Sequence, residues 1–222
     1  MRKARQIKGQ LEIATCRVKD WKGDGNSIWK TLGASNHTDE VREQDDFYAT
    51  DPDAIDSLLK VESLNGQIWE CAAGAGHLAE RLKEYGYEIY ATDIKERGYA
   101  LNSVQDFLKA EKAGFITGSG YDILTNPPYK YAKEFVLKSL ELLPVGCKCY
   151  MFLKLQFLEG LARYNEIFQS APPKAVYVFK KRVLCAKNGE FERMKEGGGS
   201  AVAYAWFVWE KGYNGKTVLG WI

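Results

Sequence analysis

Strand-like and helix-like segments alternate along this chain from residue 50 onward, and this alternation restricts the fold more than any other feature of the sequence. Short apolar runs are separated by stretches in which leucines recur at helical spacing. Such alternation predicts an α/β fold with a mostly parallel sheet and helices on both faces. The seven expected strands are 67–71, 87–92, 101–105, 121–125, 147–155, 175–179 and 202–209, and the expected helices are 53–60, 77–85, 107–113, 131–143 and 161–169.

The dipeptide Asn214-Gly215 marks a further turn near the end of the chain. Asn-Gly favours the tight turn of a two-residue β-hairpin. Because Tyr213 precedes the dipeptide and the strand-like run 216–219 follows it, we expect an antiparallel hairpin at the C-terminal end of the sheet.

Length and composition predict a single globular domain. The 222 residues can bury one full core. We expect this domain to cover residues 46–222 and to follow a basic, partly flexible arm over residues 1–45. No run approaches the roughly 20 apolar residues of a membrane span, and the N-terminus lacks the apolar stretch of a signal peptide. The sequence therefore predicts a soluble, cytoplasmic protein.

The cysteines and histidines do not form a metal-binding pattern. His37 and His77 are far apart, and no cysteine pair has the two-residue gap of a zinc site. We expect no metal and interpret the thiols as structural or incidental. The cysteines are Cys16, Cys71, Cys147, Cys149 and Cys185.

Acidic residues and glycines follow three of the expected strands. Glu70 ends the first strand, and Gly74 and Gly76 in the next turn let the backbone approach a ligand closely. Asp93 follows the second strand and can accept both hydroxyls of a ribose. The dipeptide Asp106-Phe107 follows the third and offers an acceptor for an adenine amino group beside an apolar contact for its ring. Parallel sheets bind ligands at these strand ends, so the pattern predicts a nucleoside cofactor.

The run Asn126-Pro127-Pro128-Tyr129 directly follows the apolar strand 121–125. The side-chain oxygen of Asn126 and the carbonyl oxygen of Pro127 can each accept one N–H of a planar amino group, while the Tyr129 ring stacks on its plane. Two prolines also end a strand without any chemistry, since neither donates a backbone hydrogen bond. Together with a nucleoside site, the run favours methylation of a nitrogen.

A nicotinamide enzyme is the first alternative. The segment 74–79 also satisfies the dinucleotide pattern Gly-x-Gly-x-x-Gly/Ala, with Asp93 as the ribose acid. This alternative leaves the run 126–129 unexplained, and it places Glu70 close to a pyrophosphate, which electrostatics disfavours. An S-adenosylmethionine site has no phosphate and carries an ammonium group, so an acid is favourable there.

The chain resembles S-adenosylmethionine-dependent amino-methyltransferases with an Asn-Pro-Pro-Tyr motif, most closely the short adenine-N6 DNA methyltransferases of phages and prophages. The resemblance covers roughly residues 45 to 222. The segment 47–52 is similar to the family's cofactor motif Tyr-x-Thr-Pro, with Asp51 inserted. The segment 70–76 is similar to Asp-x-Phe-x-Gly-x-Gly, with Glu for Asp and Ala72 for Phe. The motif order is that of the family's gamma group.

This resemblance implies a Rossmann-like class I methyltransferase fold and direct methyl transfer from S-adenosyl-L-methionine to the exocyclic N6 amine of adenine in DNA, after the base is flipped out of the duplex. It implies that the catalytic residues are Asn126, Pro127, Pro128 and Tyr129. The cofactor-binding residues that it implies are Tyr48, Thr50, Glu70, Ala72, Gly74, Gly76, Asp93, Asp106, Phe107 and Asn126.

Basic residues gather in two parts of a chain whose net charge is only +2. One group lies in the N-terminal arm, and the other lies in and beside a loop over about 183–200 that we expect to contact the target. The predicted nucleic-acid contacts are Lys180, Lys181, Arg182, Lys187, Arg193 and Lys195.

Several alternatives stay open at this stage. RNA adenine or another planar amine can replace DNA adenine as the substrate, and a non-catalytic domain that binds the cofactor or nucleic acid is a second alternative. Asp106 can instead cap a helix, and Trp206 and Trp209 are expected in the core rather than at a base. The sequence does not identify a recognition sequence or a restriction or specificity partner.

Overall fold

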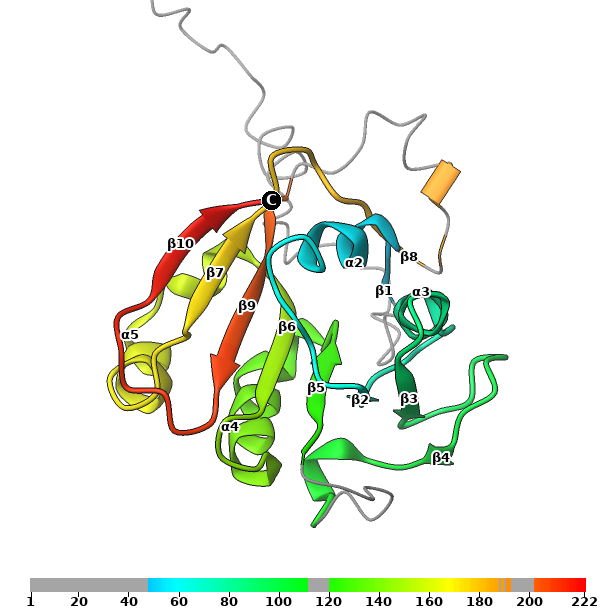
Figure 1. Cartoon of the computed structure of the whole chain (residues 1–222), viewed down its shortest axis with the longest axis horizontal. Coiled ribbons are helices and arrows are strands. Elements are labelled where there is room, and N and C mark those ends of the chain that lie inside the picture. Colours follow the sequence, from blue (N-terminus) through cyan, green and yellow to red (C-terminus); the bar gives the residue numbers. More distant parts are fainter. Residues whose placement is uncertain (1–47, 112–119, 188, 190, 193–201) are drawn as a thin grey trace, which may run out of the picture. The chain divides into compact units, whose positions relative to one another are not determined.

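The computed structural model describes residues 48–111, 120–187, 189, 191–192 and 202–222. Its centre is a sheet of eight strands in the order β10-β7-β9-β6-β5-β2-β3-β4 (Figure 1). The expected arm over 1–45 lies outside the described residues. The strands are β2 (Gln67–Glu70), β3 (Glu88–Asp93), β4 (Ser103–Val104), β5 (Asp122–Thr125), β6 (Lys148–Lys154), β7 (Ala175–Val178), β9 (Tyr204–Glu210) and β10 (Val218–Trp221).

The pairing confirms the predicted α/β fold with a mostly parallel sheet. Every neighbouring pair in the described sheet is parallel except the two made by β9, which runs antiparallel to both β6 and β7. In α/β sheets, ligands bind outside the carboxyl ends of the parallel strands. This strand order therefore places the carboxyl ends of β2, β3 and β5 side by side at the same end of the sheet.

The C-terminal part of the sheet differs from the prediction. The sheet has eight strands rather than seven, and the last strand forms no hairpin with its predecessor. Both edges of β9 are already paired, with β6 and β7, so none is left for β10. The chain turns at 211–217 and β10 pairs in parallel with the free edge of β7.

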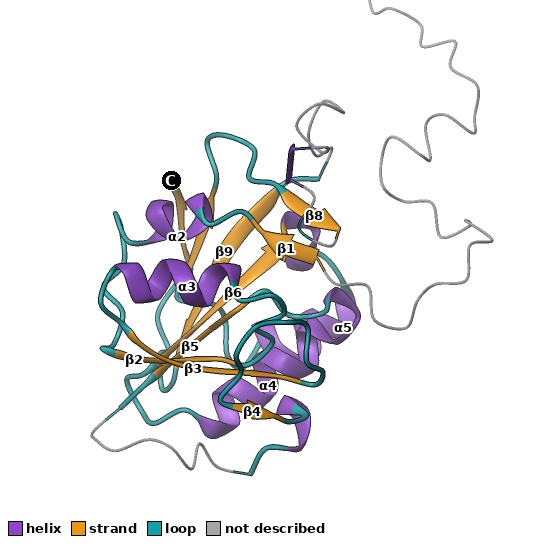
Figure 2. Cartoon of the chain, turned by 90° about the vertical axis from the view of Figure 1, so that its right-hand side faces the viewer, coloured by secondary structure: helices purple, strands orange, loops and turns teal. Residues whose placement is uncertain are grey.

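Helices cover both faces of the sheet (Figures 1 and 2). On one face, α2 (Asp53–Leu58) and α3 (His77–Glu84) pack on alternate residues of the strands, such as Tyr150 and Phe152 of β6. On the other face, α4 (Ala132–Leu142) packs on the intervening residues Cys149 and Met151. Because successive side chains of a strand point to opposite faces, the side chains of β6 and β9 alternate between the two cores. Trp206 and Trp209 are buried in these cores, as predicted.

Two expected helices differ in form. Of the segment predicted as a helix over 107–113, the structure describes residues 107–111, which contain a short 3-10 turn, Phe107–Lys109. The segment predicted over 161–169 begins as α5 (Leu161–Arg163) and continues as a π-helix, Tyr164–Phe168. In the described part of the chain, no helix is long and apolar enough to cross a membrane.

A small second sheet pairs β1 (Tyr48–Thr50) with β8 (Cys185–Lys187) in antiparallel register. Residues Thr50 and Cys185 lie opposite each other. This ribbon joins the segment before the central sheet to a segment more than a hundred residues later, so it depends on tertiary contacts rather than on local sequence.

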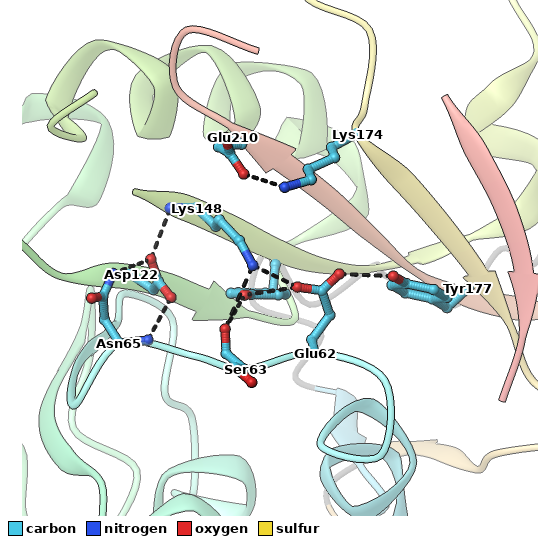
Figure 3. Close-up of polar contacts among 9 residues, drawn as sticks. Glu62, Ser63, Asn65, Asp122, Lys148, Lys174, Tyr177 and Glu210 are labelled. Carbon is cyan, nitrogen blue, oxygen red and sulfur yellow. Dashed lines mark hydrogen bonds and ion pairs between the residues drawn. The ribbon is translucent and has the colours of Figure 1, made fainter. Parts of the chain in front are cut away.

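The amino ends of the strands carry a polar cluster (Figure 3). Glu62 accepts hydrogen bonds from Lys148 Nζ at 2.7 Å, Tyr177 Oη at 2.7 Å and Tyr150 Oη at 3.4 Å. Beside it, the Asp122 carboxylate accepts three N–H groups, namely the backbone and side-chain N–H of Asn65 and the backbone N–H of Lys148. These hydrogen bonds tie the connection between α2 and β2 to strands β5, β6 and β7.

We expect Glu62→Ala to lower the free energy of unfolding by about 3 kcal/mol, because it removes the carboxylate that a mostly buried ammonium and two tyrosine hydroxyls share. The Ser63 carbonyl oxygen, 3.5 Å from both Lys148 Nζ and Tyr150 Oη, is the acceptor that remains for two of these groups. The control is Glu141→Ala, which breaks an ion pair with Lys138 in which the glutamate is exposed and which should cost less than about 1 kcal/mol. Urea unfolding of both variants measures the difference. Equal losses would contradict a structural role for Glu62.

Candidate active site at the carboxyl ends of the strands

Asn126 lies directly after β5, at the carboxyl end of the central sheet. Pro127 and Pro128 lead the chain out of the sheet, because a proline cannot donate a ladder hydrogen bond. A 3-10 turn, Tyr129–Tyr131, follows at once, and the Tyr131 N–H donates to the carbonyl oxygen of Pro128 at 2.8 Å. The four-residue motif therefore lies where a sheet of this kind binds its ligands.

The side-chain amide of Asn126 is held in one orientation. Its Nδ2 donates to the backbone carbonyl oxygen of Tyr48 at 2.9 Å and to Cys185 Sγ at 3.6 Å. A carbonyl oxygen can only accept, so the NH2 group has to face Tyr48. The Oδ1 atom of Asn126 is buried and has no hydrogen-bond partner among the described residues. The arrangement leaves one acceptor for an N–H donor from outside the protein.

The ribbon of β1 and β8 supplies both partners of this amide. Tyr48 lies at the start of β1 with an exposed side chain, whereas Thr50 at its end is buried. The Asp51 N–H then donates to the Leu184 carbonyl oxygen at 3.0 Å and extends the pairing. Thr50 Oγ1 is a second buried atom without a partner in the described part of the protein.

Asp51, the residue inserted relative to the expected cofactor motif, helps to start helix α2. Its carboxylate accepts the backbone N–H of Asp53 at 3.1 Å. Pro52 is the N-cap residue of the helix, a position near those where proline is tolerated. The insertion therefore belongs to the helix start and leaves Tyr48 and Thr50 on the strand.

Tyr129 is half-buried in an aromatic and sulfur environment. Its ring stacks with that of Tyr204 at a centroid distance of 6.1 Å, and Tyr204 stacks on Phe152 at 4.9 Å. Lys154 Nζ lies 4.9 Å from the centroid of the Tyr129 ring. The hydroxyl contacts Cys185 Sγ at 3.2 Å. Burial, with the neighbouring Cys185 and Tyr204, raises the pKa of Tyr129 well above its ordinary value, so the phenol stays neutral.

The turn after β2 depends on two glycines with left-handed backbone. Gly74 has φ 57° and Gly76 has φ 80°, a region that L side chains rarely adopt. A Cβ on Gly76 would lie 2.2 Å from a ring carbon of Tyr99. The Asp93 carboxylate accepts the Gly74 N–H at 2.8 Å through Oδ2 and the Lys95 N–H at 3.0 Å through Oδ1. Asp93 thus joins the end of β3 to the glycine turn after β2.

Glu70, the last residue of β2, is buried with Oε2 lacking any partner in the described residues. Burial, and then the nearby Asp93 carboxylate, raise the pKa of Glu70 well above its ordinary value. Ala72, two residues later, is half-buried. This setting disfavours the ionised carboxylate, and a nearby cation would favour it.

Asp106 and Phe107 do not share one role. The Asp106 side chain caps the 3-10 turn by accepting the Leu108 N–H at 3.0 Å, as the helix-cap alternative predicts. The Phe107 ring is buried in the core, where it packs on Trp69 at 5.1 Å and Phe135 at 5.0 Å. Phe107 therefore anchors the 3-10 turn to the core through its contacts with Trp69 and Phe135.

The predicted nucleic-acid contacts are only partly described. Lys180, Lys181 and Arg182 have exposed side chains just before β8, and Lys187 ends that strand. Arg193 and Lys195 lie outside the described residues. Leu184, Cys185 and Ala186 are buried and pair with the segment at β1, so this part of the expected target loop belongs to the ribbon.

Sequence reasoning missed three residues at the site: Lys154, Cys185 and Tyr204. Cys185 was expected to be a structural or incidental thiol, yet it contacts both Asn126 and Tyr129. No spacing in the sequence indicates this contact, because it arises only when β8 pairs with β1.

We expect Gly76→Ala to destabilise the protein more than Gly86→Ala. Both glycines have positive φ, but a Cβ on Gly86 meets nothing within 4 Å, whereas one on Gly76 collides with Tyr99. Gly86→Ala should cost only the left-handed strain of about 1–2 kcal/mol, and urea unfolding of both variants measures the excess. Equal losses in the free energy of unfolding would show that the Tyr99 ring moves aside without a measurable penalty, which would contradict the prediction.

Comparison with known proteins rests on structure, because no family model and no curated protein matches the sequence. The type IIG restriction endonuclease BpuSI matches with a TM-score of 0.53 at 15% identity, over 79% of this chain and 27% of that one. A protein described in the conversion of a disulfide bond into a thioacetal group during echinomycin biosynthesis matches with a TM-score of 0.50 at 10% identity, over 75% and 84%.

A class I S-adenosylmethionine-dependent methyltransferase from Listeria monocytogenes matches with a TM-score of 0.48 at 11% identity, over 88% of this chain and 71% of that one. Within the described residues, no group of three or more His, Cys, Asp or Glu could hold a metal ion. The strand order and the helix placement agree with the likenesses to the two structures matched at TM-scores of 0.53 and 0.50. The chain has the Rossmann-like fold of class I methyltransferases.

Proposed function

We propose that this protein is an S-adenosylmethionine-dependent methyltransferase that acts on the exocyclic N6 amine of adenine in DNA. The observation that carries the proposal is the Asn126 amide, whose NH2 group is bound by the protein and whose buried Oδ1 has no partner in the described structure. A buried acceptor without a partner costs free energy. An incoming amino group removes that cost and is oriented by the same bond.

The strand ends fit the cofactor. Thr50 Oγ1 and Glu70 Oε2 are also buried without partners, and buried polar atoms of this kind are explained by a ligand that satisfies them. Each oxygen of Asp93 accepts one backbone N–H and keeps a lone pair for a ribose hydroxyl. We assign the cofactor to Tyr48, Thr50, Glu70, Ala72, Gly74, Gly76, Asp93 and Asp106.

When bound, S-adenosylmethionine supplies an electrophilic methyl group. The protein orients the amine: Asn126 Oδ1 and the Pro127 carbonyl oxygen can each accept one of its hydrogens, which favours a pyramidal nitrogen with an exposed lone pair. Stacking of the base on Tyr129 would extend the series formed with Tyr204 and Phe152. Positioning of this kind can supply a large part of a rate enhancement without a strong general base.

Two observations support DNA as the substrate. The exposed basic run Lys180-Lys181-Arg182 leads directly into the ribbon that holds Asn126, so phosphate contacts there would lie close in sequence to the site. One structural neighbour is a restriction endonuclease. A base inside a duplex has to be flipped out to reach a buried acceptor such as Asn126 Oδ1.

We expect Asn126→Ala to lower kcat by roughly 100-fold or more, the order seen when one preorganised hydrogen-bonding group is removed from an active site. Cofactor affinity should change far less. The measurement is transfer of a radiolabelled methyl group to duplex DNA lacking N6-methyladenine, followed by nucleoside analysis, with Asn214→Ala at an exposed position as the control.

The result has three readings. Label in N6-methyladenine of DNA that is lost in Asn126→Ala supports the proposal. Label that appears only in matched RNA moves the substrate to RNA adenine. Cofactor binding without transfer to either nucleic acid contradicts the proposed activity and favours a binding domain.

We expect S-adenosylmethionine to bind more tightly as pH rises toward the raised pKa of Glu70. That raised pKa favours the neutral carboxyl in the free protein, whereas a bound ammonium group favours the ionised form, so binding is coupled to proton release. Calorimetry in buffers of different ionisation enthalpy measures that proton, and Glu70→Gln should abolish its release.

The same shift predicts a stability effect of defined sign. Because the folded-state pKa of Glu70 is raised, its neutral form contributes stability that is fully present below the unfolded pKa and is lost as pH rises through the folded pKa. Glu70→Gln should therefore stabilise the free protein most at alkaline pH. If affinity and stability depend on pH in the same way in Glu70→Gln as in the wild type, Glu70 is ionised in the free protein and the prediction is wrong.

A further inference from the structure

The thiol of Cys185 lies between two side chains of the Asn-Pro-Pro-Tyr motif. Its sulfur is 3.6 Å from Asn126 Nδ2 and 3.2 Å from Tyr129 Oη. Cys185 is the first residue of β8, is 3% exposed, and lies opposite Thr50 of β1. One atom of the ribbon thus contacts both the proposed amine acceptor and the proposed stacking residue.

For Asn126, the sulfur completes the set of partners that fixes the amide. One N–H of Nδ2 donates to Tyr48 O at 2.9 Å, and the sulfur is the acceptor within reach of the other. A rotated amide would place Oδ1 against a carbonyl oxygen and a thiol sulfur, which together offer at most one weak donor. With both contacts in place, Oδ1 has a single favourable orientation.

For Tyr129, the same sulfur holds the end of the ring that lies away from the backbone. Rotation of the ring about its first side-chain bond would break the hydroxyl contact, and Tyr204 packs against the ring. Burial raises the pKa of the Cys185 thiol above its ordinary value, so the group that faces this site is neutral.

We infer that Cys185 is a positioning residue, which sets the orientation of Asn126 and Tyr129 through its sulfur and thereby couples the β1–β8 ribbon to methyl transfer. The inference rests on the proposed function. Cys185 contacts two residues of the motif and is assigned no direct contact with the reacting atoms.

The test compares Cys185→Ala, Cys185→Ser and Cys149→Ala in the full chain. Cys149 is equally buried, but it packs in the core against α4. Cys185→Ala should lower kcat roughly 10- to 100-fold, as misplaced groups do, with KM for the cofactor unchanged. Cys185→Ser keeps a group that can donate and accept and should recover most of the loss. Cys149→Ala should lower stability but keep kcat.

A second measurement does not depend on activity. The side-chain NH2 signals of Asn126 can be assigned in a nitrogen–proton correlation spectrum by their loss in Asn126→Ala. In Cys185→Ala these signals should shift and exchange faster with solvent, while those of Asn65 stay unchanged at the opposite end of the sheet.

These two readouts separate the inference from the proposed function. If the wild type methylates nothing but the Asn126 signals respond to Cys185→Ala, the proposed function fails and the positioning role stands. Unchanged Asn126 signals, or a kcat loss in Cys149→Ala equal to that in Cys185→Ala, would overturn the role of Cys185.

Discussion

The hydrogen bond from Asn126 Nδ2 to the Tyr48 carbonyl oxygen is the interaction on which the candidate site depends. It decides which end of the amide faces the protein and which end faces a ligand. The acceptor belongs to β1, and β1 is held in place by β8, so the chemistry at the end of β5 relies on a ribbon outside the central sheet. A backbone carbonyl at this position makes the orientation independent of which side chain residue 48 carries.

The two ends of the sheet differ in how their polar groups are satisfied. At the amino ends, Glu62 and Asp122 accept several hydrogen bonds each, which closes that end with protein partners (Figure 3). At the carboxyl ends, buried atoms of Thr50, Glu70, Thr125 and Asn126 have no described partner, and two further atoms of this kind, in Glu134 and Ser139, lie on α4. Unsatisfied buried atoms cost stability, so the group of four at the strand ends supports a ligand site there.

The alternation of segments predicted the parallel sheet, the helices on both faces and the position of the motif after β5, because these depend on local periodicity. It did not predict that β10 pairs with β7, since this follows from β9 having both edges occupied. The contacts of Cys185 were equally out of reach, because they require the ribbon to form. The core packing of Phe107 was likewise not indicated by its motif position, which predicts a ligand contact.

The most direct test of this account is a structure of the protein with S-adenosylhomocysteine and a DNA duplex that contains a flipped adenine. The account predicts that adenine N6 lies within about 3.2 Å of Asn126 Oδ1, a hydrogen-bond distance, while Nδ2 still donates to the Tyr48 carbonyl oxygen. An Asn126 amide rotated away from Tyr48, or an adenine bound elsewhere with Oδ1 satisfied by the protein, would contradict it.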